Sequence, residues 1–237
     1  MLARSKWWEA LQLGVIGAMF ITAAVRWISV PDRIPIHWNI SGEVDGYGGR
    51  FSGLLLLPLV TLAIYALLTV IPRIDPARAN YPSFRGPYTT IRVGFVVYMA
   101  VIYAFFNISI SREAAVPVDR LIAASIAVLF VLIGLVLGKV RPNYFVGIRT
   151  PWTITSERSW VKTHSVGGWV FIAAGAASAI GAIIGGQLAL ILMFAVLIPG
   201  IVFLTAYSYF IWRSDPDRIP AQDTTPGPTG PGGNKDA

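Results

Sequence analysis

Six long apolar runs constrain this chain more than any other feature. A helix needs about 20 predominantly apolar residues to cross the hydrocarbon core of a bilayer. Six runs come close to that length, at 10–28, 52–71, 93–110, 121–137, 166–184 and 188–212. Charged residues make up 13% of the chain, against roughly 25% in soluble proteins. We therefore expect an all-α integral membrane bundle of six transmembrane helices.

The loop charges indicate how the bundle is oriented. Six crossings place both termini on one side. With the N-terminus inside, thirteen Lys and Arg residues lie in the inner segments and four lie in the outer loops. Cytoplasmic loops are enriched in these residues, so we expect both termini in the cytoplasm. The same residues account for the net charge of +7, so we expect no direct nucleic-acid binding.

The first run also has the position of a signal peptide. Its apolar core is longer than the roughly 7–15 residues of such a signal, and no convincing cleavage site follows it. We expect a retained first helix.

The composition excludes several kinds of chemistry. The chain has no cysteine and two histidines, which excludes disulfides, thiolate metal sites and cysteine nucleophiles. Glu9, Arg26 and Arg92 lie close enough to the ends of the apolar runs to snorkel. Pumps and ion-coupled transporters usually place acids or bases at mid-depth, and this pattern weighs against them. We expect a protein without catalytic residues or a cofactor.

The chain divides into three parts by pattern. Residues 1–88 form a predicted two-helix unit with a long outer loop, and residues 89–212 form a four-helix unit with a long inner loop. Residues 213–237 are rich in Pro and Gly and are predicted to be disordered. Small residues four apart allow close helix approach. We expect these small residues to pack helices within one bundle and not to form a dimer. They are Gly134 and Gly138, Gly181 and Gly185, and Ala10, Gly14 and Ala18.

The outer loop, residues 30–50, gathers polar groups that turns could bring together. Its candidate recognition residues are His37, Trp38, Asn39, Glu43 and Asp45. His, Glu and Asp are possible ligands of a divalent metal. The loop offers one imidazole, however, and Asp and Asn in Gly-rich segments usually form turns. We expect no metal site here.

The inner loop, residues 141–168, should contain a short helix. Pro151 begins a new element, and Thr153, Thr155 or Ser156 could cap a helix with Glu157 in its first turn. Its two predicted faces are Glu157, Trp160, Val161 and His164 on one side, and Arg158, Lys162 and Thr163 on the other. This pattern indicates an amphipathic helix at the cytoplasmic interface.

Two interpretations of the inner loop stay open. In one, Trp152 and Trp160 anchor the loop while His164 satisfies backbone groups. In the other, the loop is a functional surface. Glu157 and His164 are seven residues apart, about 10 Å along a helix, so they do not form a catalytic pair by direct contact. His37 and His164 are expected on opposite sides of the membrane and cannot share a site.

Both loops resemble the signatures of a known family. The outer loop reads PDRIPIHWN and then GEVDGYG, and the inner loop reads NYFVGIRTPWT and then WVKTH. These segments resemble the SdpI family of bacterial membrane proteins, including the N-terminal domain of unknown function found in that family. One departure is Ser165, where the family often has a basic residue. The resemblance implies six helices and internal termini in the bacterial cytoplasmic membrane.

The resemblance also implies a function. Immunity to a secreted peptide toxin would involve the outer loop, and signalling would hold a cytoplasmic transcriptional repressor at the membrane. The implied seam or partner-docking residues of the inner loop are Asn143, Gly147, Arg149, Thr150, Pro151, Trp152, Glu157, Trp160 and His164. The partners would be the lipid bilayer, the toxin outside and the repressor inside. Two alternatives remain: a small-molecule transporter or membrane enzyme, and a structural assembly subunit.

Overall fold

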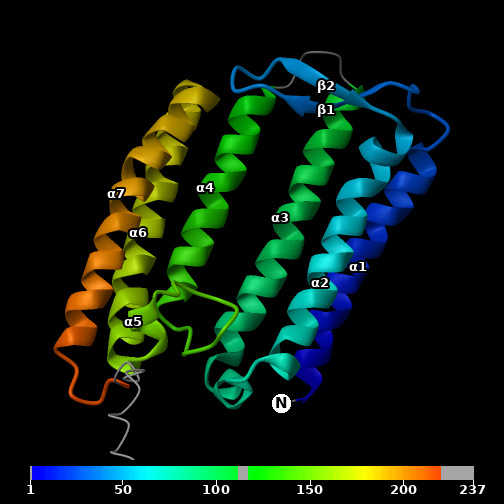
Figure 1. Ribbon diagram of the computed structural model, residues 1–237. Coiled ribbons are helices and arrows are strands. Elements are labelled where there is room, and N and C mark those ends of the chain that lie inside the picture. Colours follow the sequence, from blue (N-terminus) through cyan, green and yellow to red (C-terminus); the bar gives the residue numbers. More distant parts are fainter. Residues whose placement is uncertain (1, 112–116, 220–237) are drawn as a thin grey trace, which may run out of the picture.

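The computed structural model describes residues 2–111 and 117–219. Its elements, in chain order, are α1 (Leu2–Arg26), β1 (Ile34–Trp38), β2 (Val44–Gly48), the π-helix η1 (Phe51–Leu55), α2 (Leu56–Ile74), the 3-10 helix η2 (Arg78–Phe84), α3 (Arg85–Ser111), α4 (Val118–Leu137), α5 (Pro151–Ile154), α6 (Glu157–Ile184) and α7 (Gly186–Arg213) (Figure 1).

Within the described residues, six helical segments are long and apolar enough to cross a membrane. They are Lys6–Arg26, Phe51–Ile74, Arg78–Ile110, Val118–Leu137, Glu157–Ile184 and Gly186–Arg213. Each contains most of one predicted run, so the all-α bundle of six membrane helices is confirmed. The hairpin of β1 and β2 was not predicted.

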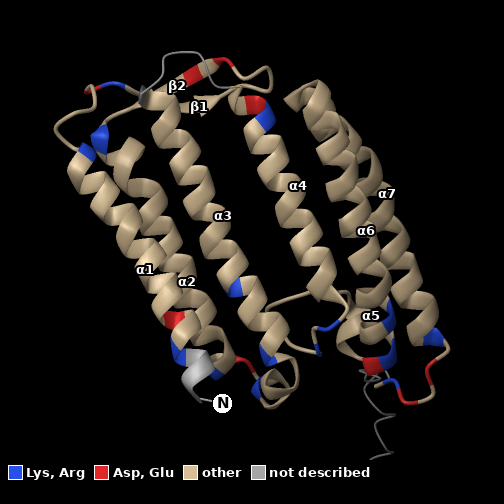
Figure 2. Cartoon of the chain, turned by 180° about the vertical axis from the view of Figure 1, so that it is seen from behind, with Lys and Arg blue, Asp and Glu red and all other residues tan. Residues whose placement is uncertain are grey.

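The helices run antiparallel, with the long loops at opposite ends (Figure 1). We call the end that carries β1 and β2 the hairpin end, and the end that carries α5 the loop end. The chain enters α1 and leaves α7 at the loop end. Lys and Arg concentrate toward that end (Figure 2). The side of the membrane that each end faces stays a prediction.

Glycines bring α4 and α6 into close contact. A Cβ on Gly134 would lie 2.5 Å from the carbonyl oxygen of Gly168, and a Cβ on Gly168 would lie 2.7 Å from that of Gly134. Any side chain at either position would force the helices apart. Gly181 has a similar contact with Ala189 at the α6–α7 turn. Gly14 has no atom near its Cβ direction, so the small residues of α1 make no comparable contact there.

The first residues of the C-terminal tail are placed against the loop end. The backbone N–H of Ile219 donates to the carbonyl of Thr155 at 2.9 Å, and Arg158 donates to the carbonyl of Ser214 at 3.4 Å. The expected disorder is therefore wrong for residues 213–219, because hydrogen bonds hold this segment. The prediction for residues 220–237 lies outside the described residues, and the division of the chain at residue 88 also stays a prediction.

Candidate functional site

The hairpin folds because its first strand has a buried anchor and its turn has an internal cap. Ile34 is fully buried and packs with Val30, Ala23 and Leu54 between the ends of α1 and α2. Asn39 makes the turn: its Oδ1 accepts from the N–H of Ser41 at 2.9 Å and of Glu43 at 3.0 Å. Gly42 has φ +82°, which a glycine adopts without strain.

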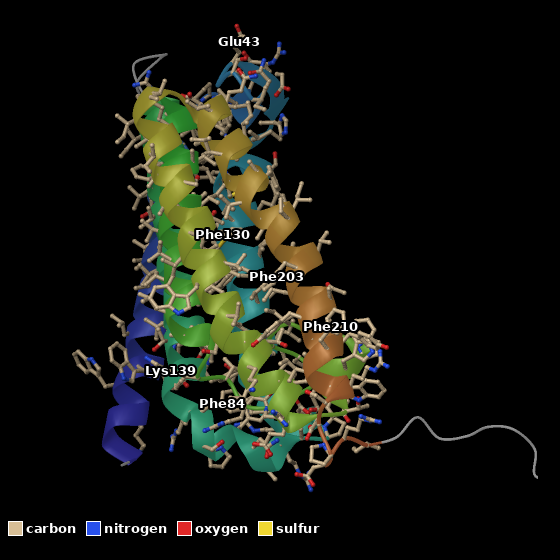
Figure 3. The ribbon with its side chains drawn as sticks, turned by 90° about the vertical axis from the view of Figure 1, so that its left-hand side faces the viewer. Glu43, Phe84, Phe130, Lys139, Phe203 and Phe210 are labelled. Carbon is tan, nitrogen blue, oxygen red and sulfur yellow. The ribbon has the colours of Figure 1, made fainter. Side chains whose placement is uncertain are left out.

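The hairpin displays two side-chain pairs to solvent. His37 Nδ1 lies 2.5 Å from Asp45 Oδ1 across the strands, and Asn39 Nδ2 donates to Glu43 Oε2 at 2.9 Å. The side chains of His37 and Asp45 are 70% and 44% exposed. Four of the five predicted outer residues are thus brought together, at the extreme end of the molecule where Glu43 lies (Figure 3).

The fifth outer residue, Trp38, anchors the hairpin. Its ring meets the ring of Phe106 in α3 edge-on, with centroids 5.9 Å apart. At the turn, a Cβ on Gly42 would lie 3.1 Å from the Cβ of Asp119, whose Oδ2 accepts from the N–H of Gly186 at 2.9 Å. The hairpin therefore rests on α3 and α4 as well as on α1 and α2. Nowhere in residues 2–111 and 117–219 does a group of three His, Asp or Glu side chains gather for a metal ion.

Asn143 organises the start of the inner loop. Its Oδ1 accepts from the N–H groups of Phe145 at 2.9 Å and Val146 at 2.6 Å. Its Nδ2 donates to the carbonyls of Arg141 at 2.9 Å and Val146 at 2.8 Å. Because all of these are backbone groups of the same loop, this buried amide fixes the loop's shape.

His164 and Trp160 hold the loop against α6. His164 is fully buried; its Nε2 accepts from the N–H of Ile148 at 2.9 Å, and its Nδ1 donates to the carbonyl of Trp160 at 2.8 Å. The two rings stack 4.0 Å apart, and Trp160 Nε1 donates to the carbonyl of Val140 at 2.9 Å. Both imidazole nitrogens are occupied by backbone groups, which favours the structural interpretation of His164.

Gly147 is required for that arrangement. Its φ is +128°, and a Cβ would lie 2.3 Å from His164 Nε2. A side chain would therefore meet both backbone strain and the buried imidazole.

Thr150, Pro151 and Trp152 begin the short helix α5. Thr150 Oγ1 accepts from the N–H of Thr153 at 3.1 Å, with Pro151 at the first helical position. Trp152 meets Tyr209 of α7 edge-on at 5.3 Å. Arg149 is exposed and donates to the carbonyl of Tyr144.

The predicted interfacial helix is wrong as a separate element. Residues 157–184 form one continuous helix, α6, capped by Ser156, whose Oγ accepts from the N–H of Ser159 at 2.9 Å. Trp160 and His164 are buried, but Glu157 of the same predicted face is exposed, and Thr163 of the other predicted face is buried. The predicted division into one buried and one exposed face is wrong because α6 packs on α7 as well as on the inner loop. For example, Ser159 Oγ donates to the carbonyl of Ser208 in α7 at 2.8 Å.

Two buried aspartates that sequence reasoning missed hold the ends of the inner loop. Asp75 Oδ2 accepts from the N–H of Tyr144 at 3.1 Å and from the hydroxyl of Tyr81 at 2.8 Å. Asp215 Oδ2 accepts from the hydroxyl of Ser156. Each aspartate lies within two residues of the end of a membrane helix and is followed by Pro and, two residues after the Pro, by Arg. That repeated pattern was the available signal.

Asp215 lies beyond the last residue of α7, outside the membrane-spanning segments. The hydrogen bond from Ser156 lowers the pKa of Asp215 below its ordinary value of 3.8, against the opposing effect of desolvation. The positive charges of Arg158 and Arg218 act in the same direction as the hydrogen bond.

Sequence reasoning also missed an ion pair between Glu9 of α1 and Arg92 of α3, which is hydrogen-bonded to two residues of α2. Arg92 donates to Glu9 Oε1 at 2.8 Å and to Oε2 at 3.0 Å. Tyr65 donates to Glu9 at 2.7 Å, and Arg92 also donates to Thr69 Oγ1 at 2.8 Å. The two charges were expected to snorkel separately. They pair instead, because their helices place them side by side.

Comparison with known proteins now decides the family. Residues 139–208 match the SdpI/YfhL protein family, and residues 14–62 match a domain of unknown function, DUF1648; together these regions make up half of the chain. The chain belongs to the SdpI family. The immunity protein SdpI of Bacillus subtilis (strain 168) is 19% identical over 199 residues, which cover 84% of this chain and 93% of that protein. No solved structure matches the chain.

The matches fall on the two loops described above. The SdpI/YfhL region runs from the inner loop through α6 into α7, and the DUF1648 region runs from α1 through the hairpin into α2. Membership of the SdpI family and the six apolar helices together make the chain a multi-pass protein of the bacterial cytoplasmic membrane. The predicted resemblance is confirmed.

Proposed function

We propose that this SdpI-family protein gives its cell immunity to a secreted peptide toxin, without catalysis, and that the hairpin of β1 and β2 recognises the toxin. A general immunity role is supported by the similarity to a protein named for immunity. The observation that carries the recognition site is the exposed pair of His37 and Asp45 on a hairpin anchored to four membrane helices.

The hairpin has the properties of a recognition surface. Its base is fixed by Ile34 and Trp38, while its solvent face offers an imidazole, an amide and two carboxylates. A rigid base lowers the entropy cost of binding. The exposed carboxylates of Glu43 and Asp45 favour a peptide that presents basic or hydrogen-bond-donating groups.

The inner loop divides into a seam and a surface. Asn143, Gly147, Trp160 and His164 form the seam, since each is engaged in the packing of the loop. Arg149, Arg158 and Lys162 are exposed at the loop end. As part of the proposal, these cations would dock the acidic surface of a cytoplasmic repressor when toxin is bound.

A toxin-challenge experiment tests the immunity proposal. Cells expressing the protein should survive a secreted membrane-active peptide toxin better than cells without it. His37→Ala with Asp45→Ala should remove this protection at unchanged membrane abundance. Ser41→Ala at the same turn should keep it, because Ser41 contributes its backbone N–H to the turn. Full protection in the double variant would remove the hairpin from the mechanism, and equal survival with and without the protein would reject immunity to that toxin.

The docking part needs its own measurement. Arg158→Glu with Lys162→Glu should weaken recruitment of a repressor to the membrane while leaving abundance unchanged, since surface charges contribute little to stability. Trp160→Ala should instead lower abundance. Unchanged recruitment in the charge-reversal variant would reject the docking surface.

A transporter is the second candidate, and the Glu9–Arg92 pair is the observation that favours it. Ionisable residues within membrane helices often mark the path of a substrate or a proton. Arg92 lies seven residues into α3, about 10 Å from its start. Substrate-dependent proton uptake into vesicles, lost in Glu9→Gln, would support transport over immunity.

A further inference from the structure

An apolar groove runs along the surface between α4 and α6. Its volume is about 510 Å³, and it extends on α4 from Arg120 to Leu132 and on α6 from Gly175 to Ile183. Both stretches lie in the half of the bundle next to the hairpin end (Figure 1). The groove is separate from the hairpin surface and from the inner loop.

Small residues create the space. The two helix backbones touch at the base of the groove, where a Cβ on Gly175 would lie 2.7 Å from the carbonyl of Ala127. Larger side chains along either helix would fill the space above that contact. The small lining residues are Ala124, Ala127, Gly175, Ala176, Ala179 and Ala182.

One charge stands at the hairpin end of this apolar lining. Arg120 lines the groove, and its Nη1 donates to the carbonyl of Ile183 at 3.4 Å, so it reaches from α4 to α6. The ion pairs formed among residues 2–111 and 117–219 are those of His37, Arg50 and Arg92. Arg120 therefore has no carboxylate partner in that part of the chain, and it presents positive charge in the first turn of α4, at the hairpin end of the bundle.

The dimensions select the kind of occupant. From Arg120 to Leu132 α4 rises about 18 Å, slightly more than the roughly 15 Å depth of one leaflet of the hydrocarbon core. The groove therefore has the length of one extended hydrocarbon chain of that leaflet.

We propose that this groove binds one acyl chain of an anionic phospholipid from the leaflet at the hairpin end, with the lipid phosphate on Arg120. The apolar lining matches the chain, the length matches one leaflet, and the arginine matches the phosphate. An arginine near the membrane surface should favour an anionic lipid over a zwitterionic one about fivefold. The bound lipid would fill the surface between α4 and α6 beside the hairpin.

Photocrosslinking in vesicles tests the proposal with the full chain. The probe is phosphatidylglycerol with a photoreactive acyl chain, present as a minor component in phosphatidylcholine, and photoreactive phosphatidylcholine is the comparison. Crosslinks mapped by mass spectrometry should concentrate on residues 120–132 and 175–183. Labelling there should be about fivefold stronger with phosphatidylglycerol.

Matched variants separate the groove from the rest of the surface. Ala176→Leu with Ala179→Leu should suppress labelling in the groove, whereas Ala173→Leu, an exposed position of α6 outside the groove lining, should leave it unchanged. If the double variant does not fold, Ala124→Leu serves as the filling variant. Arg120→Gln should remove the preference for phosphatidylglycerol, and Arg33→Gln, directly before β1, should keep it.

Three outcomes would overturn the proposal. Labelling could be spread evenly over all six helices, or it could persist in the groove of the filled variants. The preference for phosphatidylglycerol could survive Arg120→Gln. Because the chain has no native cysteine, a second copy as occupant can also be recognised: Ala179→Cys would then form disulfide-linked dimers in the membrane.

Discussion

At the scale of single residues, the inner signature is explained by hydrogen bonds that only its own residue types can make. Asn143 serves four backbone groups of the loop with one amide. His164 accepts from one loop N–H through an imidazole nitrogen. Gly147 leaves the room that this imidazole occupies. These positions are therefore parts of one packed structure, and each can be tested by substitution.

Gly147→Ala should destabilise the protein. The φ of +128° and the contact with His164 Nε2 both oppose a side chain, and strain of this kind costs about 2 kcal/mol. Thermal unfolding in detergent and membrane abundance measure the effect. Gly86→Ala is the matched control, because no atom lies within 4 Å of its Cβ position and the residue is helical. Equal stability of the two variants would contradict this explanation of the motif.

Asp215 should make the contact of residues 214–219 with the loop end dependent on pH. Since its pKa is lowered in the folded protein, the contact is fully stabilised above the ordinary value of 3.8 and is lost as the pH falls through the lower folded value. Asp215→Asn should therefore speed hydrogen exchange in this segment at neutral pH. Asp217→Asn is the control, and equal exchange in both variants would argue against a role for the Ser156–Asp215 bond.

At the scale of elements, the sequence predicted the membrane helices well because each consists of an uninterrupted apolar run. The hairpin was missed because its strands are five residues long and contain Pro and Gly, which usually indicate turns. The short amphipathic helix was wrongly separated from α6, since local periodicity does not reveal that α7 covers a second face. The contacts of Asp75 and Asp215 are long-range, so the repeated Asp-Pro-x-Arg pattern marks the two residues in the sequence but does not reveal their partners.

The Glu9–Arg92 pair should tie α1 to α3. Removing one partner of a buried pair typically costs roughly 3–5 kcal/mol. The Glu9 side chain is 35% exposed, so we expect about 2 kcal/mol from Glu9→Met, with part of the loss restored in Glu9→Met with Arg92→Met. Unfolding of both variants in detergent measures this. The free energy of unfolding of Arg92→Met is measured as well. If the loss in the double variant equals the sum of the losses in the two single variants, the two side chains are not coupled.

At the scale of the whole molecule, the two ends of the bundle differ in kind. The hairpin end carries an exposed polar surface on a fixed base, while the loop end carries a packed loop surrounded by exposed cations (Figure 2). The charge bias predicts that the hairpin faces outward and the loop faces the cytoplasm. A toxin that arrives from outside would then meet the hairpin first.

The orientation can be measured without removing native cysteines, because there are none. Ser41→Cys at the hairpin turn should react with a membrane-impermeant maleimide on intact cells. Ser83→Cys in η2, at the loop end, should react only after the membrane is permeabilised. Both positions are exposed. The reverse pattern would overturn the orientation.

Recognition of a toxin by the hairpin is the central claim, and the same labelling reaction tests it most directly. The rate of Ser41→Cys labelling is measured on intact cells with and without the toxin against which the protein protects. We expect the toxin to slow labelling in the otherwise unchanged hairpin and to have no effect when His37→Ala and Asp45→Ala are added. A labelling rate that does not change with toxin, in cells that remain protected, would contradict the claim.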